Sequence, residues 1–324
     1  MELNLSFSAL LLVGFAHGFL PPPPQFNGTR PPPLVGRVFN NNTEKYGGCV
    51  GGVQTYPSDW PNAYYYQRYC RTNLGLAVVT DGIAPDSAIE RTAWTLDNMM
   101  ATMDSYVADK MIEGGFRQAV MGRYPSETVT SLPEYRDQDP MFWNDRRGCG
   151  ATIWTPVGCN AEEDVLCYPD GLYPNMDITV HEFGHSLHLL GFSQIWPQFQ
   201  EGLDACYNNA FSNNLWGSGY IGSYSMTNAQ EYFANGLMTY FDVQYPYDEE
   251  APRTRTELYQ KDPQFPLTPM GVLAHRLRTL DRLLVPPSAR AEIFWHTCLQ
   301  SHLQTSPPTP QKSYLKFRNP RTKT

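Results

Sequence analysis

The stretch His181-Glu182-Phe183-Gly184-His185 decides the fold, because it is an H-E-x-x-H motif. Two imidazoles four residues apart on one helix can bind a single zinc ion, while the carboxylate between them acts on the bound water. A rotation of about 100° per residue brings His188 to the same helix face. The motif therefore predicts a helix that presents a zinc site on one side.

The residues around the motif predict where this helix begins and ends. Asp177 is a candidate N-cap before Ile178, and Gly191 is a candidate stop after Leu190. The side opposite the histidines carries an apolar stripe made of Val180, Phe183, Leu187 and Leu190. We expect a helix over residues 178–190 with one face toward the metal and the other toward the core.

The segments before the motif have the patterns of strands and helices. Strands are expected at residues 76–80, 116–122 and 151–155. Residues 87–103 have helical periodicity, with a capping-box pattern at Ser87 and Glu90. Residues 159–174 are expected to form a loop that leads into the motif helix. The chain therefore opens as strand, helix, strand.

A catalytic zinc site has three protein ligands and one open position, so the chain must supply one more ligand. His188 is excluded because it lies about 10.5 Å along the helix from His181, at about 1.5 Å per residue. It is expected to lie behind a ligand, to face the substrate, or to be an ordinary polar position. The metzincin pattern needs a glycine where this chain has His188, so a carboxylate is expected as the third ligand.

Two downstream acids are candidates for that ligand, Glu201 and Glu231. Glu231 lies in a stretch, residues 228–242, that has the better helical pattern. Thr227 and Gln230 form a capping-box pair before an apolar stripe of Phe233, Leu237, Tyr240 and Phe241. The pattern favours Glu231 as the third ligand. The alternative interpretation of Glu231 is a solvated acid on a helix surface without a metal.

The motif helix, followed 46 residues after His185 by Glu231-Tyr232-Phe233-Ala234, resembles the gluzincin group of zinc endopeptidases. Within that group it is similar to the anthrax lethal factor-like catalytic domain and its secreted fungal, bacterial and invertebrate relatives. The resemblance covers residues 164–242. It implies a zincin-like metalloprotease fold of the α+β class, with a mixed sheet packed on the motif-bearing active-site helix and a mainly helical C-terminal subdomain.

The resemblance also implies the cofactor and the site residues. It implies Zn2+ bound by His181, His185 and Glu231. It suggests that the hydroxyl of Tyr224 points toward the reacting oxygen, with Tyr220 and Tyr232 as rivals. Relatives often carry a second acid four residues after the third ligand, where this chain has Asn235. An amide can still form hydrogen bonds there but brings no charge.

These residues predict a zinc-dependent endopeptidase that hydrolyses peptide bonds in a protein or peptide substrate. Zinc would activate a water molecule, and Glu182 would act as the general base. The alternative is a catalytically weak or inactive secreted zinc-binding glycoprotein or toxin-like binding module. Glu182 argues against it, because a structural zinc site does not need that carboxylate. An aminopeptidase with Glu201 as ligand would need a group that binds the substrate amine, and none is evident.

The ends of the chain differ from its middle. Residues 1–18 have the short apolar run and the cleavage pattern of a signal peptide, which predicts a secreted, extracellular protein. Residues 19–44 form a proline-rich arm with glycosylation sequons at Asn27 and Asn41. Residues 45–250 are assigned to the zinc metallopeptidase domain and residues 251–324 to a basic tail.

The charge of the tail does not by itself indicate nucleic acid. Residues 253–324 hold 12 Lys or Arg and 4 Asp or Glu, in a chain whose net charge is −8. We expect the tail to dock on the acidic remainder or to be disordered, and we expect no nucleic-acid partner. No segment after the signal peptide has the length and hydropathy of a membrane span. The oligomeric state is not predicted.

Seven cysteines in a chain that enters the secretory path predict three disulfides and one remaining thiol. Cys49 carries two competing hypotheses. Its thiolate can occupy the fourth zinc position in a latent precursor, or it can pair with Cys70. The second hypothesis is favoured, because short loops of secreted proteins are commonly closed by disulfides.

Overall fold

A computed structural model of the chain describes residues 48–101, 103, 105–173, 176–244 and 250–265. The expected signal peptide, the proline-rich arm with its two sequons, and the tail from residue 266 onward lie outside the described residues. The domain limits assigned to these segments therefore stay predictions.

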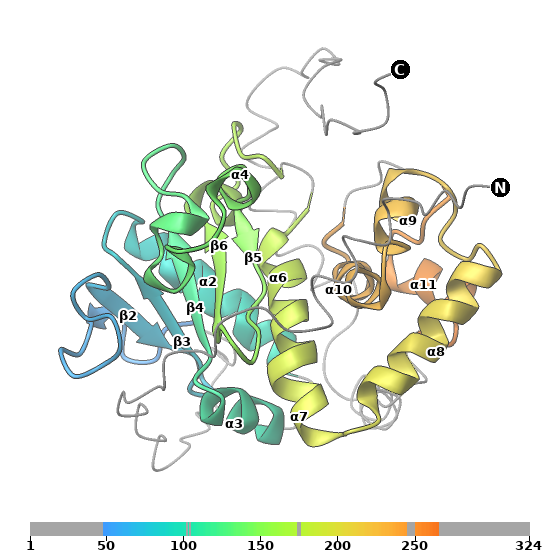
Figure 1. The fold of residues 1–324 in the computed structure, drawn as a ribbon, viewed down its shortest axis with the longest axis horizontal. Helices are drawn as coiled ribbons and strands as arrows, with labels where there is room; N and C mark the ends of the chain where they lie inside the picture. The colour runs from blue at the N-terminus through green and yellow to red at the C-terminus, as the bar shows by residue number, and fades with distance from the viewer. Residues whose placement is uncertain (1–47, 102, 104, 174–175, 245–249, 266–324) are drawn as a thin grey trace, which may run out of the picture.

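Six strands of the described chain form one mixed sheet in the order β1-β2-β3-β4-β6-β5 (Figure 1). Their bounds are Gln54–Thr55 (β1), Arg68–Arg71 (β2), Ala77–Thr80 (β3), Arg117–Met121 (β4), Gly148–Cys149 (β5) and Val157–Ala161 (β6). Strands β3, β4 and β6 run parallel, and the remaining strands are antiparallel to their neighbours. The short strand β5 is therefore one edge of the sheet.

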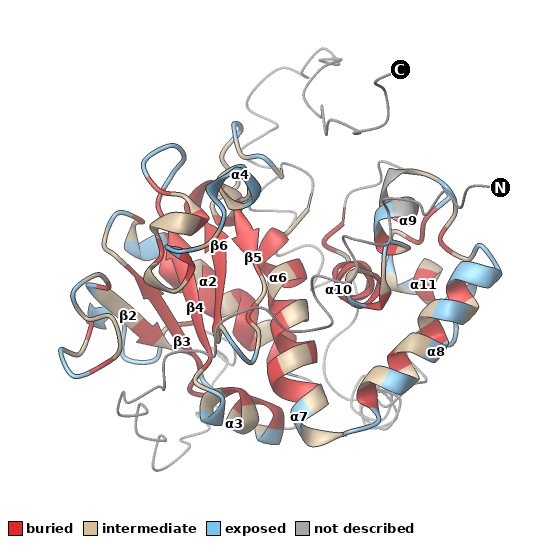
Figure 2. Cartoon of the chain, in the orientation of Figure 1, coloured by how far each residue is buried: buried red, intermediate tan, exposed pale blue. Residues whose placement is uncertain are grey.

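Alternate residues of the central strands point into two cores, as the period of two along a strand requires. Val78 and Val120 pack with the helices on one face, whereas Val79 and Ala119 pack under the segments on the other face. The helical face is covered by α2 (Asp86–Met100), α3 (Ser105–Glu113) and α6 (Ile178–Ser186). The opposite face is covered by short 3-10 helices at Val129–Ser131 and Pro133–Tyr135 and by the aromatic residues before β2. Figure 2 shows the central strands β3, β4 and β6 and the inner side of α6 as buried.

The expected strands at residues 76–80 and 116–122 are present as β3 and β4. The strand expected at residues 151–155 is wrong, because these residues form the loop between β5 and β6. The Thr152 hydroxyl accepts hydrogen bonds from the backbone N–H groups of Trp154 and Thr155, which stabilises a turn instead of a strand. Strand β6 instead occupies part of the stretch that was expected to be a loop.

The expected helix at residues 87–103 is α2, but its capping box is absent. The helix begins at Asp86 after Pro85, which provides no side-chain cap, and it ends at Met100. Two further short helices, α4 (Pro140–Trp143) and α5 (Glu162–Val165), lie between the strands and the motif helix.

The part of the chain after α6 is mainly helical. A π-helix (Leu187–Phe192) continues α6 and is followed by α7 (Ser193–Ile195), α8 (Phe199–Ser212), α9 (Tyr220–Ser225), α10 (Ala229–Tyr240) and α11 (Arg255–Lys261). Figure 1 places α8 to α11 on the side of α6 away from the sheet, with α10 facing α6. The expected α+β class is thereby confirmed, with a mixed sheet packed on the motif helix and a helical part after it.

The described cysteines include two of the three predicted disulfides and the remaining thiol. Cys49 pairs with Cys70, and Cys149 pairs with Cys159 across the β5 and β6 strands. Cys167 is also disulfide-bonded, and Cys206 is a buried thiol whose Sγ donates to the carbonyl oxygen of Gln264. Because Cys49 is held in a disulfide, the hypothesis that its thiolate blocks the zinc position is wrong. Among the described helices, none has the length and apolar character needed to cross a membrane.

Candidate metal centre

The motif helix α6 begins where the sequence predicts. The Asp177 side chain accepts hydrogen bonds from the backbone N–H groups of Thr179 (3.0 Å) and Val180 (3.4 Å), so it is the N-cap. The predicted apolar stripe is fully buried: Val180, Phe183, Leu187 and Leu190. Packing of this stripe fixes the rotation of the helix and leaves the histidine face toward α10.

Gly191 does not end the helix, which continues through the π-helical segment to Ile195. A Cβ at Gly191 would lie 2.9 Å from Val107 Cγ1, so this glycine allows α3 to pack closely on the segment. The stop predicted at this position is wrong, because tertiary packing explains the glycine.

Helix α10 carries the third residue of the site in its first turn. Its N-cap is Asn228, whose side chain accepts from the backbone N–H groups of Gln230 and Glu231 at 2.9 Å each. The capping box predicted with Thr227 and Gln230 is therefore wrong, because Asn228 caps the helix with its own side chain. Helix α10 approaches α6 closely at Gly184, where a Cβ would lie 3.2 Å from Ala234 Cα. This glycine inside the motif brings Glu231 within reach of the histidines.

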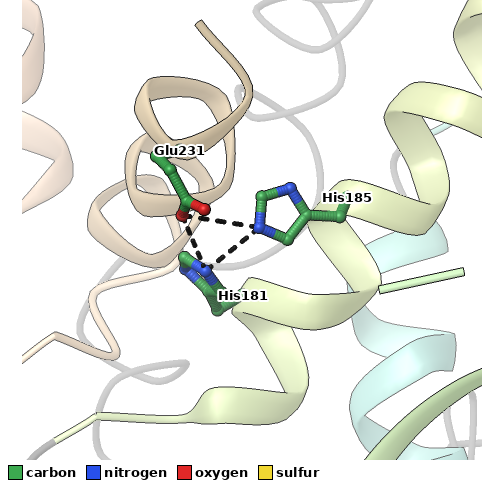
Figure 3. A group of neighbouring side chains, drawn as sticks. All are labelled: His181, His185 and Glu231. Carbon is green, nitrogen blue, oxygen red and sulfur yellow. Dashed lines mark hydrogen bonds and ion pairs between the residues drawn. The ribbon is translucent and has the colours of Figure 1, made fainter. Parts of the chain in front are cut away.

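Three side chains converge between α6 and α10 (Figure 3). His181 Nε2 lies 3.1 Å from His185 Nε2, and Glu231 Oε2 lies 3.2 Å and 3.5 Å from these two nitrogens. Two atoms that are each about 2.1 Å from a zinc ion at the tetrahedral angle are about 3.4 Å apart. The three separations fit that triangle, so the cluster can hold a metal ion through three ligand atoms.

The hydrogen bonds around His181 set which of its nitrogens faces the cluster. Asn235 Oδ1 lies 3.1 Å from His181 Nδ1, and Asn235 Nδ2 donates to Ser225 Oγ at 3.0 Å. With its amide oriented in this way, Asn235 accepts the Nδ1–H of His181 and leaves the Nε2 lone pair directed at His185 and Glu231. Asn235 thus supports His181 without adding charge.

The electrostatics of Glu231 also favour a cation at this point. Burial raises the pKa of Glu231, but the two imidazoles outweigh burial and hold that pKa well below its usual range. The carboxylate is therefore ionised beside two imidazoles, and a set of two imidazoles and one carboxylate suits zinc and other borderline divalent metals.

Glu182 projects from α6 toward the sheet edge. A Cβ at Gly148 would lie 2.7 Å from both Cγ and Oε1 of Glu182, and a Cβ at Gly150 would lie 2.4 Å from His185 Cβ. Glycines at both positions therefore make room for the motif. Burial raises the pKa of Glu182 to about 7, although the charge of His185 opposes this effect. A carboxyl group with this pKa can both accept and release a proton near neutral pH.

Tyr224 is the described tyrosine candidate that lies beside the cluster. Its ring centroid is 6.2 Å from that of His181, and 39% of its surface is exposed. Desolvation of the hydroxyl and the charges of Glu231 and Glu182 raise its pKa above the usual range, so the phenol stays protonated. Tyr232 is buried and its hydroxyl donates to Asp262 Oδ2 at 2.6 Å, away from the cluster. The side chain of Tyr220 lies outside the described part of the structure.

Two other candidates are not part of the cluster. Glu201 is exposed on α8. His188 is fully buried, its Nε2 lies 2.8 Å from Gln200 Oε1, and its ring packs against Phe199 and Phe233. The suggestion that His188 faces the substrate is therefore wrong. Burial lowers its pKa to about 4.

Two residues near Glu182 were not singled out from the sequence. The Tyr173 phenol and the Arg146 guanidinium are close enough to Glu182 and Tyr224 to influence them electrostatically. No local pattern distinguishes them, because each lies in a loop and is brought to the site by the sheet edge and by the loop before α6.

Comparison with protein-family models and with curated protein sequences gives no match. Among solved structures, the chain is similar to a Pro-Pro endopeptidase from Paenibacillus alvei, with a TM-score of 0.39 and 16% sequence identity. The matched region covers 61% of this chain and 96% of that chain. A similarity at this level carries no argument about activity, which rests on the residues of the site.

Proposed function

We propose that this protein is a secreted zinc-dependent endopeptidase with a zincin-like fold. His181, His185 and Glu231 are the proposed zinc ligands, Glu182 is the proposed general base, and Tyr224 is the proposed oxyanion donor. The triangle of ligand atoms beside Glu182 carries the proposal. A structural zinc site closes its fourth position with another protein ligand, whereas the described residues supply three ligand atoms here, next to the Glu182 carboxyl group in the same motif.

When bound, zinc supplies a water molecule of lowered pKa and polarises the scissile carbonyl. Glu182 takes the proton of the water, and a pKa of about 7 allows it to pass that proton to the leaving amine. The protonated Tyr224 hydroxyl donates a hydrogen bond to the oxygen that gains negative charge. Asn235 holds His181 in the tautomer that the ligand role requires.

The proposed setting is extracellular. The Cys49–Cys70 and Cys149–Cys159 disulfides support it, because such bonds persist in oxidising compartments. The proposed substrate is a protein or peptide.

The decisive experiment measures zinc content and peptide cleavage in the same preparations. Wild type should hold one zinc per chain and cleave members of a mixed peptide library. Glu182→Gln should keep zinc and lose cleavage, and Glu231→Ala should lose both. Glu201→Ala is the matched control and should resemble wild type. If Glu182→Gln turned over peptides at the wild-type rate, the mechanism would be wrong, and zinc binding without any cleavage would support the binding-module alternative.

A further inference from the structure

Arg146 lies between α4 and β5, on the segment that leads to Gly148. Its Nε donates to the carbonyl oxygen of Phe142 at 3.1 Å, and its Cζ lies 4.2 Å from the centroid of the Phe142 ring. The side chain is half-buried. In the view of Figure 1, α4 lies above β5. The backbone hydrogen bond and the cation–π contact therefore hold the guanidinium in one place at the edge of the sheet.

The guanidinium is close to the catalytic groups. Two residues after Arg146, the backbone at Gly148 lies against the side chain of Glu182. Burial has the largest effect on the pKa values of Glu182, Tyr173 and Tyr224, but the positive charge of Arg146 lowers all three. Because this one charge acts on three groups of the site, the guanidinium lies within electrostatic range of all three.

The neighbouring arginine shows what a structural role looks like in this segment. Arg147 is fully buried, forms an ion pair with Glu163 at 2.5 Å, and donates to the carbonyl oxygens of Glu127 and Gly122. Arg146 has no such arrangement, because no carboxylate of the described residues forms an ion pair with it. Its guanidinium retains donors that can form a planar, bidentate pair with a carboxylate.

We propose that Arg146 binds a carboxylate of the peptide substrate close to the scissile bond, and that the site prefers peptides with an acidic group at that position. This inference rests on the proposed peptidase function. The carboxylate can belong to an Asp or Glu side chain or to the substrate C-terminus, since both offer the same pair of oxygens.

The test compares peptides that differ in one carboxylate. Peptides cleaved by wild type are synthesised with Glu or Gln at each position around the scissile bond, and with a free or amidated C-terminus. The measured quantity is the ratio of kcat/KM within each pair. At one position, or at the C-terminus, wild type should prefer the acid by about tenfold or more, as for a charge-assisted hydrogen bond.

Arg146→Gln should reduce the kcat/KM ratio of acid to amide peptide to about one. Arg146→Lys should retain part of the preference, because Lys keeps the positive charge but lacks the planar guanidinium that pairs with both carboxylate oxygens. Arg136→Gln is the matched control, since Arg136 is exposed and lies over Tyr64, and it should keep the wild-type ratio. If Arg146 acts only on the charge of Glu182, the pH profile shifts equally for both peptides and the ratio stays constant.

Three outcomes separate the two proposals. Cleavage without an acid preference in wild type, or an unchanged preference in Arg146→Gln, overturns the role of Arg146 and leaves the peptidase function standing. A zinc-loaded wild type that cleaves no peptide overturns both. A preference that is lost in Arg146→Gln and kept in Arg136→Gln supports the assignment.

Discussion

Two glycines at the sheet edge should have separable effects on metal binding and on catalysis. Neither Gly148 nor Gly150 is among the described glycines with a positive φ, so alanine is compatible with the backbone at both positions. A Cβ at Gly150 would lie 2.4 Å from His185 Cβ, whereas ordinary contacts begin at 3.4 Å. Gly150→Ala must therefore move His185 or strand β5 by about 1 Å, since a Cβ cannot rotate away.

The expected magnitudes follow from these displacements. A shift of about 1 Å takes His185 Nε2 outside the range of metal–ligand distances, so the zinc dissociation constant of Gly150→Ala should rise about 10-fold to 100-fold. In Gly148→Ala, the added Cβ would meet Cγ and Oε1 of Glu182 at 2.7 Å and Ile178 Cγ1 at 3.0 Å, so its closest clash is with the general base. This variant should bind zinc as wild type does, and its kcat should fall about 100-fold.

The assay is zinc competition against a chromophoric chelator, combined with kcat and KM for a peptide that wild type cleaves. Gly114→Ala is the control, because the nearest neighbour of its added Cβ is 3.3 Å away and belongs to a different part of the fold. Wild-type zinc affinity in Gly150→Ala, or loss of zinc in Gly148→Ala, would refute the reasoning. Unfolding curves of all three variants exclude a general loss of structure.

Three further outcomes are expected. Asn235→Ala should weaken zinc binding about tenfold or more, because it removes the acceptor of the His181 Nδ1–H, and Asn235→Asp should strengthen binding through its added charge; chelator competition measures both. Burial lowers the pKa of His188 from 6.5 to about 4. Between these pH values the imidazole is protonated in the unfolded chain but not in the folded chain, so a fall in pH favours unfolding. Zinc-free protein should lose about 3 kcal/mol of unfolding free energy in that window, and His188→Gln should remove this component in urea titrations at pH 7 and 4.5. Removal of zinc by a chelator should abolish peptide cleavage, and added zinc should restore it. Circular dichroism of the zinc-free protein should show the helical signal of wild type, and loss of that signal would contradict a site that is positioned by packing alone.

Local patterns were sufficient for the elements whose stabilising contacts lie close in sequence. The Asp177 cap and the apolar stripe from Val180 to Leu190 predict α6, because a cap and a helical face are properties of consecutive turns. The strands β3 and β4 are apolar enough to be recognised. Strand β6 is not, since Val157–Ala161 contains Gly, Cys and Asn, and its strand conformation depends on pairing with β4 and β5.

The groups that support the site could not be read from the sequence for a related reason. The sequence identifies Glu231 as a candidate, but its distance from His181 depends on how closely α10 crosses α6 at Gly184. His188 shares the histidine face on an ideal helical projection, yet it is buried next to Gln200, and the chain is π-helical from Leu187 onward. Arg146 can be identified as a neighbour of the site only once the packing of the sheet edge is known.

The arrangement of these glycines supports the proposal that the site is catalytic rather than structural. Helix α6 is held between strand β5 on one side and α10 on the other, and glycines remove the Cβ atoms at the points of closest approach: Gly148, Gly150 and Gly184. The ligands therefore sit on elements that are positioned by the buried cores and by the Asp177 and Asn228 caps. A structural zinc site ties together segments that do not otherwise fold. Here packing positions the proposed ligands, and Gly148 and Gly150 make room for the proposed base and for His185.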